Sequence, residues 1–553
     1  MELYFSKTLK IDDFSGIHLL QDHIGTFYGS PWNDYDYIVK FKIYYVEDGL
    51  KQSLGMLRLL VNGQQNTSNY LVEKGVAVSD KIYLLKDVIN DTNAVSLPLE
   101  IEYYHKINKL LEGADISIFL EKLCDASYFY GNFNTYKKWE GFMGSIMRES
   151  SASEAILKKG HQIAIGRYTP KKKFDIEFES SSELMESATF YFDKSKSIGK
   201  ANINLLTGKN GVGKSFLLKE LTEVIVGIKP SQGSWPYFHK LIVVAYSPFE
   251  NFHTKNQVLT SLKQKYSKNK KINKKENPKR GMSINEYAYI GFRNESGKFD
   301  IEWPEKHSVE SLINILKYDD VNSWWELKPR FQILKETLSL CVDFDEIAVK
   351  MVDQIDFVVL NEKTLDEIEI KKVAVQEGIF FIKDGKPLSL SSGQKIFSYM
   401  IPSIVSEIEE ESLVIVDEPE LYLHPHLEVG FINMMKYLLS ETSSCSIIAS
   451  HSAILTREIK KQGVKVLRKK DGVTSVSQPS LQTYGESLES IIGEVFDDYS
   501  SDKAFYKEID AYITTHENNV SLEQLSPLLG DEALAYISSK LENGMEFKVS
   551  EDK

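Results

Sequence analysis

The sequence is 553 residues long, and its 66 lysines and arginines stand against 79 aspartates and glutamates, giving a formal net charge of −13. One hydrophobic core seldom serves a chain of this length, so we expect two or three domains. Charged residues make up 26% and hydrophobic residues 42% of the chain, as in an ordinary globular protein. The acidic balance disfavours nucleic-acid binding by the chain as a whole, which would need a local basic patch.

The three cysteines, Cys124, Cys341 and Cys445, lie far apart and form no CxxC pair. This spacing disfavours a zinc site or a disulfide framework and suits a reducing compartment. No apolar run approaches the roughly 18 residues that a membrane helix needs. The first ten residues, MELYFSKTLK, lack a signal-peptide pattern. We therefore expect a cytoplasmic protein without membrane contact.

The first 160 or so residues precede every motif described below, and we expect them to form an α+β accessory domain. Alternating apolar residues predict strands at Tyr37–Val46 and Met56–Val61, and a helical pattern covers Ile107–Cys124. Aromatic residues are dense from Tyr128 to Phe142. A core packed with aromatic rings is favoured over a ligand or partner surface, because aromatic side chains dominate core burial.

Three short β-like runs lead up to the first motif, at Ile163–Tyr168, Phe174–Phe178 and Thr189–Phe192. Tyr168 or Phe190 is a candidate for stacking on an adenine ring. A place in the core is favoured for either residue, because a lone aromatic side chain usually packs inside a protein.

A phosphate-binding loop follows the apolar run Ile203–Leu206, which predicts a buried strand. The sequence GKNGVGKS matches the pattern G-x-x-x-x-G-K-S and precedes a predicted helix that includes Phe216–Val226. Glycines let successive N–H groups cradle phosphates, and the helix N-terminus adds its positive dipole. A glycine-rich turn without function could match by chance, but the strand before it and the helix after it favour nucleotide binding. The candidate contact residues are Gly208, Asn210, Gly211, Gly213, Lys214 and Ser215.

A strongly basic segment follows the next predicted strand, Leu241–Ala245. Lys263–Arg280 carries eight lysines and one arginine against the single Glu276. Two interpretations stay open. The segment is a solvated loop, or it contacts a nucleic-acid backbone with Tyr266 available for stacking.

The rest of this insertion, which spans roughly residues 250–350, has a helical pattern and is too short for a long coiled-coil arm. Beyond it the pattern changes to strands before the next motif. We predict helices at Val309–Leu316, Trp324–Leu340 and Phe344–Ile355, and strands at Asp356–Leu360 and Gly378–Ile382.

Three further motifs follow in order. The pentapeptide LSSGQ, Leu390–Gln394, precedes a predicted helix at Lys395–Ile408. The run LVIV predicts a buried parallel strand whose carboxyl end presents Asp417 to magnesium and Glu418 to a water molecule. The run IIAS predicts a second such strand, with His451 at its tip. The chain therefore carries a specific combination of four motifs in order: the phosphate loop, LSSGQ, the paired carboxylates and the histidine at the tip of a strand.

These motifs resemble those of the ABC-type ATPases, over roughly residues 165–500. The resemblance implies an α/β fold, with a P-loop ATPase domain that has a mixed sheet and a helical insertion. In that family two ATPase domains face each other head to tail, and the LSSGQ signature of one closes over the ATP held by the other. It therefore implies a homodimer in which four signature residues act in trans, namely Ser391, Ser392, Gly393 and Gln394.

The resemblance also implies a role for each residue of the site, with ATP and Mg²⁺ as the cofactors. Lys214 and Ser215 would bind phosphate and magnesium, and Asp417 would support the metal ion. Glu418 matches the general base that polarises the attacking water, and His451 matches the switch residue near the γ-phosphate. Phosphoryl transfer agrees with this set, because it needs charge neutralisation and a positioned water rather than a covalent nucleophile.

At two places the sequence departs from the usual pattern of the ABC-type ATPases. Where such ATPases have a glutamine after the strand at Leu241–Ala245, this chain reads SPFE at Ser247–Glu250, so the coupling residue is unassigned. After Glu418 the chain reads PELYLHPH instead of the transporter sequence SALD. The pattern DEPExxLHP, with ASHS downstream, is similar to the OLD-, RecF- and PtuA-like ATPases of bacterial DNA repair and antiphage defence. His424 and His426 fit a helix start at Pro425 better than a metal site, because no third ligand is evident.

The last hundred residues predict helices and no further chemistry. OLD-type nucleases continue into a nuclease domain with an Asp-x-Asp motif, but none follows His451 here, and the one at Asp343–Asp345 is interpreted as an exposed turn. The chain is therefore expected to lack its own nuclease. The predicted helices are Leu488–Phe496, Lys503–Thr514, Leu522–Leu529 and Glu532–Leu541.

We expect an α+β accessory domain over residues 1–160, the ATPase domain over 161–500 and a helical segment over 501–553. The similarity to PtuA-like ATPases implies antiphage defence with a separate HNH-type nuclease as partner, and possible contact with nucleic acid through Lys263–Arg280. The alternative is a RecF- or Rad50-like repair ATPase that acts directly on DNA. A transporter motor is disfavoured by the long leader and the absence of SALD.

Overall fold

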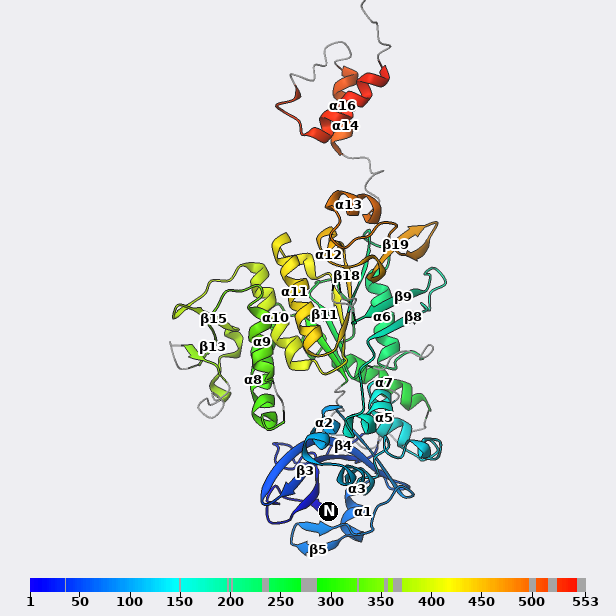
Figure 1. Ribbon diagram of the computed structural model, residues 1–553, viewed down its shortest axis with the longest axis vertical. Helices are drawn as coiled ribbons and strands as arrows, with labels where there is room; N and C mark the ends of the chain where they lie inside the picture. The colour runs from blue at the N-terminus through cyan, green and yellow to red at the C-terminus, as the bar shows by residue number, and fades with distance from the viewer. Residues whose placement is uncertain are drawn as a thin grey trace, which may run out of the picture. The chain divides into compact units, whose positions relative to one another are not determined.

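The computed structural model describes residues 1–34, 36–148, 151–195, 198–199, 202–230, 238–269, 286–325, 328–352, 357–361, 370–496, 504–515 and 525–544. By compactness the chain divides into two units, Met1–Glu486 and Ser487–Lys553. In the residues that the structure describes, the larger unit contains four sheets and the smaller contains helices (Figure 1). Among the described residues, none of the helices is both long and apolar enough to cross a membrane.

The N-terminal residues form a seven-stranded sheet with the order β5-β6-β1-β2-β3-β4-β7. The pair β1–β2 is parallel, and the other neighbouring pairs are antiparallel. The two predicted strands of this region are confirmed as β3 and β4. The strands are β1 (Leu3–Ser6), β2 (Gly16–Gln21), β3 (Lys40–Glu47), β4 (Leu50–Val61), β5 (Val76–Ser79), β6 (Ile82–Leu84) and β7 (Ala94–Pro98).

Helices pack their apolar sides into the core of this sheet, and two sequence predictions about them are wrong. The stretch Ile107–Cys124 is two helices, because Gly113 adopts a left-handed φ of 52° between them. Ile163–Tyr168 is not a strand, since Ile163 lies in the last turn of a helix that ends before Gly166 (φ 68°). The helices are α1 (Thr67–Lys74), α2 (Glu102–Leu110), α3 (Ala114–Lys122), α4 (Phe133–Tyr136) and α5 (Ser151–Ala164).

The aromatic stretch after α3 belongs mainly to the same core. Tyr136 and Phe142 are 1% and 0% exposed, and partly buried aromatic rings such as Phe133 and Trp139 pack against the cluster. Tyr130 is an exception at 47% exposure. The core interpretation of this stretch is therefore confirmed, with Tyr130 as the exposed exception.

A two-stranded hairpin, β8 (Lys173–Phe178) and β9 (Ala188–Asp193), follows as predicted. Phe190 is fully buried in the core beneath the phosphate loop, so it cannot stack on a base. Tyr168 donates a hydrogen bond from its hydroxyl to Glu411 Oε2 at 2.6 Å. Its ring also lies beside Lys159. Both adenine-stacking candidates are thus engaged elsewhere.

The second seven-stranded sheet carries the motifs, in the order β12-β11-β17-β18-β10-β19-β20. The neighbours from β12 to β19 are parallel, and β20 is antiparallel, so the sheet is mixed. Its central strands are buried on both faces, which explains their unbroken apolar sequences. They are β10 (Ile203–Gly208), β11 (Leu241–Ala245), β12 (Tyr287–Gly291), β17 (Leu413–Asp417), β18 (Cys445–Ser450), β19 (Val464–Lys470) and β20 (Val473–Ser477).

Helices pack on this sheet. The helix α6 (Lys214–Ile225) buries Leu217, Leu218 and Leu221 against alternate strand residues such as Ile415 and Ile447. Figure 1 shows α6 on one side of the sheet and α11 on the other. Further helices of this region are α7 (Lys255–Asn269), α10 (Ser392–Glu407), α11 (Pro425–Glu441) and α12 (Ala453–Arg457).

Between α7 and α10 lies a subdomain of two helices and a small sheet. The helix α8 (Trp303–Asn322) contains the predicted helix Val309–Leu316 but is longer, and α9 (Arg330–Leu338) covers only the later part of the predicted helix Trp324–Leu340. The predicted helix Phe344–Ile355 is wrong for its described part, Phe344–Val352, which contains a strand. Ile347 and Val349 instead point the same way from a strand, and Ile347 pairs with Phe381. The sheet order is β14-β13-β15-β16, with β13 (Glu346–Lys350), β14 (Phe357–Val359), β15 (Phe380–Lys383) and β16 (Lys386–Pro387).

The smaller unit contains three described helices, α13 (Leu488–Phe496), α14 (Ala504–Thr515) and α16 (Asp531–Gly544). Their bounds agree with the prediction within three residues at each end. Ile509 and Ile537 join α14 to α16 in a small apolar cluster. Of the predicted helix Leu522–Leu529, residues 522–524 lie outside the described residues, and the described part after Leu525 is a turn.

Candidate nucleotide-binding site

The strand order brings the motifs to one edge of the second sheet. β18 pairs in parallel with both β10 and β17, so the carboxyl ends of these three strands are adjacent. The phosphate loop follows β10, Glu418 follows β17 and His451 follows β18. Open parallel sheets place their ligand sites at this edge.

The phosphate loop depends on backbone conformations that glycine permits. Gly208, Gly211 and Gly213 have φ angles of 143°, 77° and 100°. A side chain on Gly208 would come within 2.3 Å of the Leu467 carbonyl oxygen on β19, so this position has no room for a Cβ. On the other side of the loop, Thr474 donates a hydrogen bond from Oγ1 to the Val212 carbonyl at 3.0 Å.

Lys214 is the first residue of α6 and is only 5% exposed. Its ammonium group donates to the carbonyl oxygens of Gly208 at 3.0 Å and Lys209 at 3.2 Å. It also lies 2.8 Å from Nε2 of His451. Burial lowers the pKa of Lys214 to about 8, while the carboxylates of Glu418 and Asp417 act in the opposite direction. Lys214 therefore joins the loop after β10 to the loop after β18.

The next residue, Ser215, contacts the carboxylate at the end of β17. Its hydroxyl donates to Asp417 Oδ1 at 3.0 Å. Asp417 is 3% exposed, and burial raises its pKa to about 7, although the Ser215 hydrogen bond opposes this shift. A hydroxyl and a carboxylate side by side are the hard oxygen donors that Mg²⁺ prefers. The pair is therefore chemically suited to hold this ion.

Glu418 stands at the sharp turn that leaves β17. Its φ of 50° lies in the left-handed region, where a non-glycine residue is uncommon. The backbone N–H of Glu418 donates to the Ala449 carbonyl at 2.9 Å, which ties this turn to β18. Its carboxylate lies 3.5 Å from His451 Nε2. The contact with His451, together with the charge of Lys214, lowers the pKa of Glu418, so this carboxyl group stays ionised.

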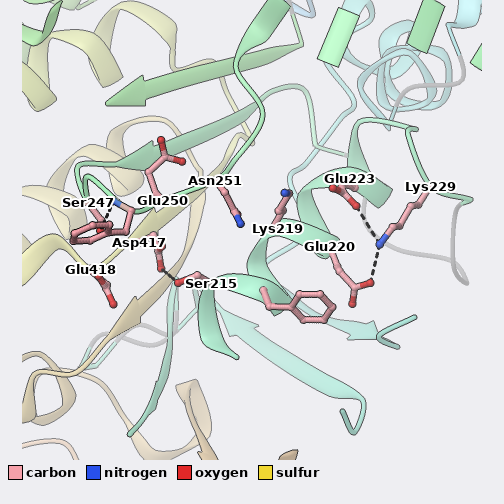
Figure 2. A pocket seen from close by; sticks show the side chains of 12 residues that line it. Ser215, Lys219, Glu220, Glu223, Lys229, Ser247, Glu250, Asn251, Asp417 and Glu418 are labelled. Carbon is pink, nitrogen blue, oxygen red and sulfur yellow. Dashed lines mark hydrogen bonds and ion pairs between the residues drawn. The ribbon is translucent and has the colours of Figure 1, made fainter. Parts of the chain in front are cut away.

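A cavity of about 530 Å³ opens beside Ser215, Asp417 and Glu418. Figure 2 shows the Ser215–Asp417 hydrogen bond near one end and Lys229 bridging Glu220 and Glu223 at the other. The remaining lining residues come from α6 and from the loop after β11, and they are Phe216, Lys219, Ser247, Phe249, Glu250 and Asn251.

The loop after β11 lies at the position where the ABC-type ATPases carry a glutamine, for which no equivalent is assigned in this chain. Glu250 forms an ion pair with Arg293 Nε at 2.5 Å and accepts a hydrogen bond from the Tyr289 hydroxyl at 2.7 Å. The carboxylate of Glu250 is thus committed to this contact, and only 3% of its side chain is exposed. Asn251, the next residue, is exposed and faces the cavity (Figure 2).

The LSSGQ segment forms the start of α10. Ser391 and Gln394 form a reciprocal capping box, with distances of 3.3 Å and 3.0 Å. Gly393 is buried, and a Cβ there would approach Leu427 within 2.6 Å. The two serines, Ser391 and Ser392, are exposed. Within the described parts of the chain, the hydrogen bonds of Ser391–Gln394 reach their own turn and Cys341, and none reaches the phosphate loop.

Two other candidate sites have structural roles. His424 is the N-cap of α11, and its Nδ1 accepts from the His426 N–H at 3.4 Å, so the helix begins at Pro425 as predicted. Asp343 and Asp345 are exposed beside Lys383, at 2.8 Å and 3.2 Å. No cluster of three or more His, Cys, Asp or Glu side chains suited to a metal ion occurs among the described residues.

The basic segment is described only in part. Lys263–Asn269 continues the helix α7, and Lys265 donates to the Gly227 carbonyl at 2.9 Å. Residues 270–285, which include the rest of Lys263–Arg280, lie outside the described residues. The nucleic-acid interpretation of this segment stays a prediction.

Glu420 also lies in the site, although none of the sequence motifs described above points to it. Glu420 lies in a short 3₁₀ helix, Pro419–Tyr422, directly after Glu418. Its Oε1 accepts a hydrogen bond from the backbone N–H of His451 at 2.5 Å. The sequence feature that could have indicated this residue is the second glutamate of DEPE.

Comparison with known proteins gives a consistent picture. Residues 353–457 match the family described as "AAA domain, putative AbiEii toxin, Type IV TA system". Protein ea59 of Escherichia phage lambda is 23% identical over 502 residues, which cover 84% of each chain. Septu protein PtuA of Bacillus thuringiensis is 23% identical over 286 residues, which cover 45% of this chain and 66% of PtuA.

One solved structure with weak similarity is the SMC head domain from Thermotoga maritima, which is 12% identical to this chain with a TM-score of 0.28. The match covers 56% of this chain and 100% of the SMC head domain. Another is cbiO1 from Clostridium perfringens, part of an ABC transporter complex, with 15% identity and a TM-score of 0.26, which covers 62% of this chain and 97% of that one. Scores this low add nothing to the assignment. The chain is thus similar in sequence to an AAA-domain family and to Septu protein PtuA, in agreement with the resemblance of its motifs to those of the ABC-type ATPases.

Proposed function

We propose that this protein binds ATP with Mg²⁺ and hydrolyses it. The observation that carries the proposal is the meeting of three strand ends, where Ser215 contacts Asp417 at 3.0 Å and Lys214 contacts His451 at 2.8 Å. These contacts gather a cation, a hydroxyl, two carboxylates and an imidazole around one phosphate-binding loop. Phosphoryl transfer requires charge neutralisation and a positioned water, and this set supplies both.

Each side chain has a distinct role in the proposed reaction. Lys214 and the N–H groups of the loop hold the phosphates. Ser215 and Asp417 hold the magnesium ion, which neutralises charge on the phosphate oxygens when it is bound. Glu418, kept ionised by its surroundings, orients and polarises the attacking water. His451 stands beside Lys214, where the γ-phosphate would lie.

We further propose a head-to-tail homodimer in which LSSGQ acts on the nucleotide of the partner subunit. Two features support this arrangement. Ser391 and Ser392 are exposed at the N-terminus of a 16-residue helix, which favours anions. Within the described residues the segment makes no hydrogen bond to its own phosphate loop, so it is available to another subunit.

The biological role is proposed from similarity. The partial match to Septu protein PtuA and the DEPExxLHP sequence support antiphage defence. The effector is proposed to be a separate HNH-type nuclease that the ATPase regulates, as the resemblance to PtuA-like ATPases implies. The basic segment Lys263–Arg280 is the proposed contact for nucleic acid.

Co-purification tests this role. The full chain is isolated from its native host, and bound proteins and nucleic acids are identified by mass spectrometry and sequencing. A small nuclease in the complex supports the defence role. A homodimer without an effector, whose ATPase activity rises with DNA, would contradict it and favour the RecF- or Rad50-like alternative.

Size measurement tests the dimer. Light scattering after gel filtration compares the Glu418→Gln variant with and without ATP and Mg²⁺, and Ser392→Arg serves as the interface variant. We expect ATP to convert Glu418→Gln from monomer to dimer and expect the added Ser392→Arg to prevent this. ATP-dependent dimerisation that survives Ser392→Arg would overturn the proposed use of LSSGQ.

A further inference from the structure

Two hydrogen bonds, which we call crosslinks below, join the turn after β17 to the turn after β18. In one, the backbone N–H of Glu418 donates to the Ala449 carbonyl at 2.9 Å. In the other, the backbone N–H of His451 donates to the carboxylate of Glu420 at 2.5 Å. The first crosslink uses only backbone atoms, whereas the second depends on one side chain. A substitution can therefore remove the second crosslink without altering the first.

The second crosslink holds the backbone of His451, whose ring contacts Lys214. His451 directly follows the fully buried Ser450, so its backbone is anchored on one side by β18. On the other side the chain turns toward α12, and the Glu420 bond fixes the peptide N–H at this point. The imidazole then lies 2.8 Å from Lys214 Nζ and 3.5 Å from Glu418 Oε1.

We propose that Glu420 is a positioning residue that acts through His451 in ATP hydrolysis, a role that rests on the proposed function above. Glu420 is hydrogen-bonded to the backbone N–H of His451 and to the side chain of Ser450. A carboxylate that accepts from an N–H forms one of the stronger protein hydrogen bonds. Its loss would free the His451 peptide to rotate and would displace the ring from Lys214 and Glu418. Displacements of about 1 Å at such a centre reduce turnover strongly.

A neighbouring glutamate provides a matched control. Glu428 of α11 accepts a hydrogen bond from the hydroxyl of Ser452, the residue after His451. The two carboxylates therefore support the same turn, but only Glu420 accepts from the His451 N–H. If general support of the turn were sufficient, loss of either carboxylate would have the same effect.

The experiment measures kcat and KM for ATP hydrolysis by the full chain. Because a hydrogen bond to a charged group contributes about 1.5–3 kcal/mol, we expect Glu420→Ala to lower kcat by about 10- to 100-fold. KM should change by less than about threefold, since the phosphate loop is intact. Glu420→Gln keeps a carbonyl acceptor for the N–H and should restore most of the activity. Glu428→Ala should reduce kcat by less than about threefold.

A double-mutant cycle separates positioning through His451 from a general structural effect. In a His451→Ala background, Glu420→Ala should lower kcat by less than about twofold, because the ring that it positions is already absent. An additive loss, an unchanged kcat for Glu420→Ala, or a Glu420→Gln variant as impaired as Glu420→Ala would overturn the proposal. If the wild-type protein itself hydrolysed no ATP, the proposed function would fail instead. Should Glu420→Ala not fold, the cycle is run with Glu420→Asp, which is too short to keep the bond.

Discussion

Ser215 and Asp417 are 202 positions apart in the sequence, yet the serine hydroxyl donates a hydrogen bond to the aspartate carboxylate at 3.0 Å. Their contact joins the first turn of α6 to the last residue of β17. It exists because β18 lies between β10 and β17 and brings the ends of all three parallel strands to one edge.

The first prediction concerns this pair. Ser215→Ala and Asp417→Asn should each raise the Mg²⁺ concentration needed for half-maximal ATPase activity by at least about 10-fold, because each removes an oxygen donor for the ion. Activity is measured over a magnesium titration at saturating ATP. Thr222→Ala on the same helix is the control, since its hydroxyl bonds to the Leu218 carbonyl, inside α6. An unchanged magnesium requirement in both variants would remove the pair from the metal site.

The second prediction concerns the attachment of the N-terminal region to β17. Lys159 of α5 lies 2.9 Å from Glu411, two residues before the strand that ends at Asp417. Both side chains are largely buried, at 15% and 10% exposure. Lys159→Met leaves the Glu411 charge without this partner and should lower the free energy of unfolding by about 3 kcal/mol.

Urea unfolding checks this value. Lys158→Met is the control, because Lys158 is exposed and its i,i+4 pair with Glu154 at 3.9 Å should contribute less than about 0.5 kcal/mol. Adding Glu411→Gln to Lys159→Met should recover part of the loss, since the unpaired charge is then absent. Equal effects of Lys158→Met and Lys159→Met would show that the buried contact does not stabilise the protein.

The third prediction is a pH dependence of stability. Asp125 is fully buried, and burial raises its pKa to about 6, although N–H groups of Tyr128 and Ser127 and the Tyr104 hydroxyl oppose the shift. Between about pH 4 and 6 the folded protein keeps a proton that the unfolded chain has released. The contribution of Asp125 is therefore fully present below pH 4 and is lost as the pH rises through 6.

Asp125→Asn tests this window, because the amide oxygen can still accept the same hydrogen bonds. Relative to wild type, the variant should gain up to about 3 kcal/mol of unfolding free energy between pH 4 and pH 7. The measurement is a series of urea titrations at several pH values. A constant difference between the two proteins across this range would contradict the prediction.

The fourth prediction concerns the basic segment. Replacing Lys270, Lys271, Lys274 and Lys275 by glutamate should weaken binding to a labelled DNA or RNA strand and flatten its salt dependence, by about one unit of slope for each lost phosphate contact. Fluorescence anisotropy over a salt series measures both effects. Reversal of the exposed Lys171 and Lys172 is the control. Binding that is unaffected by the four replacements would leave the segment as a solvated loop.

The strand and the helix on either side of the phosphate loop could be predicted from the sequence because their signals are local. A strand, a glycine-rich loop and a helix follow one another within Ile203–Ile225, so a single pattern describes them. The buried runs before Glu418 and His451 predict parallel strands, and parallel strands end at a common edge. The closeness of Lys214 to His451 follows from these two facts.

The remaining features depend on contacts that no local pattern encodes. The hydrogen bond from His451 to Glu420 joins two turns, and each turn alone looks like an ordinary helix start. Ile347 and Val349 fit a helix and a strand equally in sequence, and pairing with β15 decides for the strand. Ile163 is helical because α5 extends as far as Ala164. The chain leaves the helix at Gly166, whose φ of 68° is not helical.

The most direct measurement of the central claim is ATP hydrolysis by wild type, Glu418→Gln and Lys214→Ala, with binding of a labelled ATP measured in parallel. The account predicts that the wild-type protein turns over ATP and that Glu418→Gln binds ATP but hydrolyses it at least about 100-fold more slowly. Lys214→Ala should lose binding as well as hydrolysis. A Glu418→Gln protein that hydrolyses ATP at the wild-type rate would contradict the assignment of Glu418 as the base.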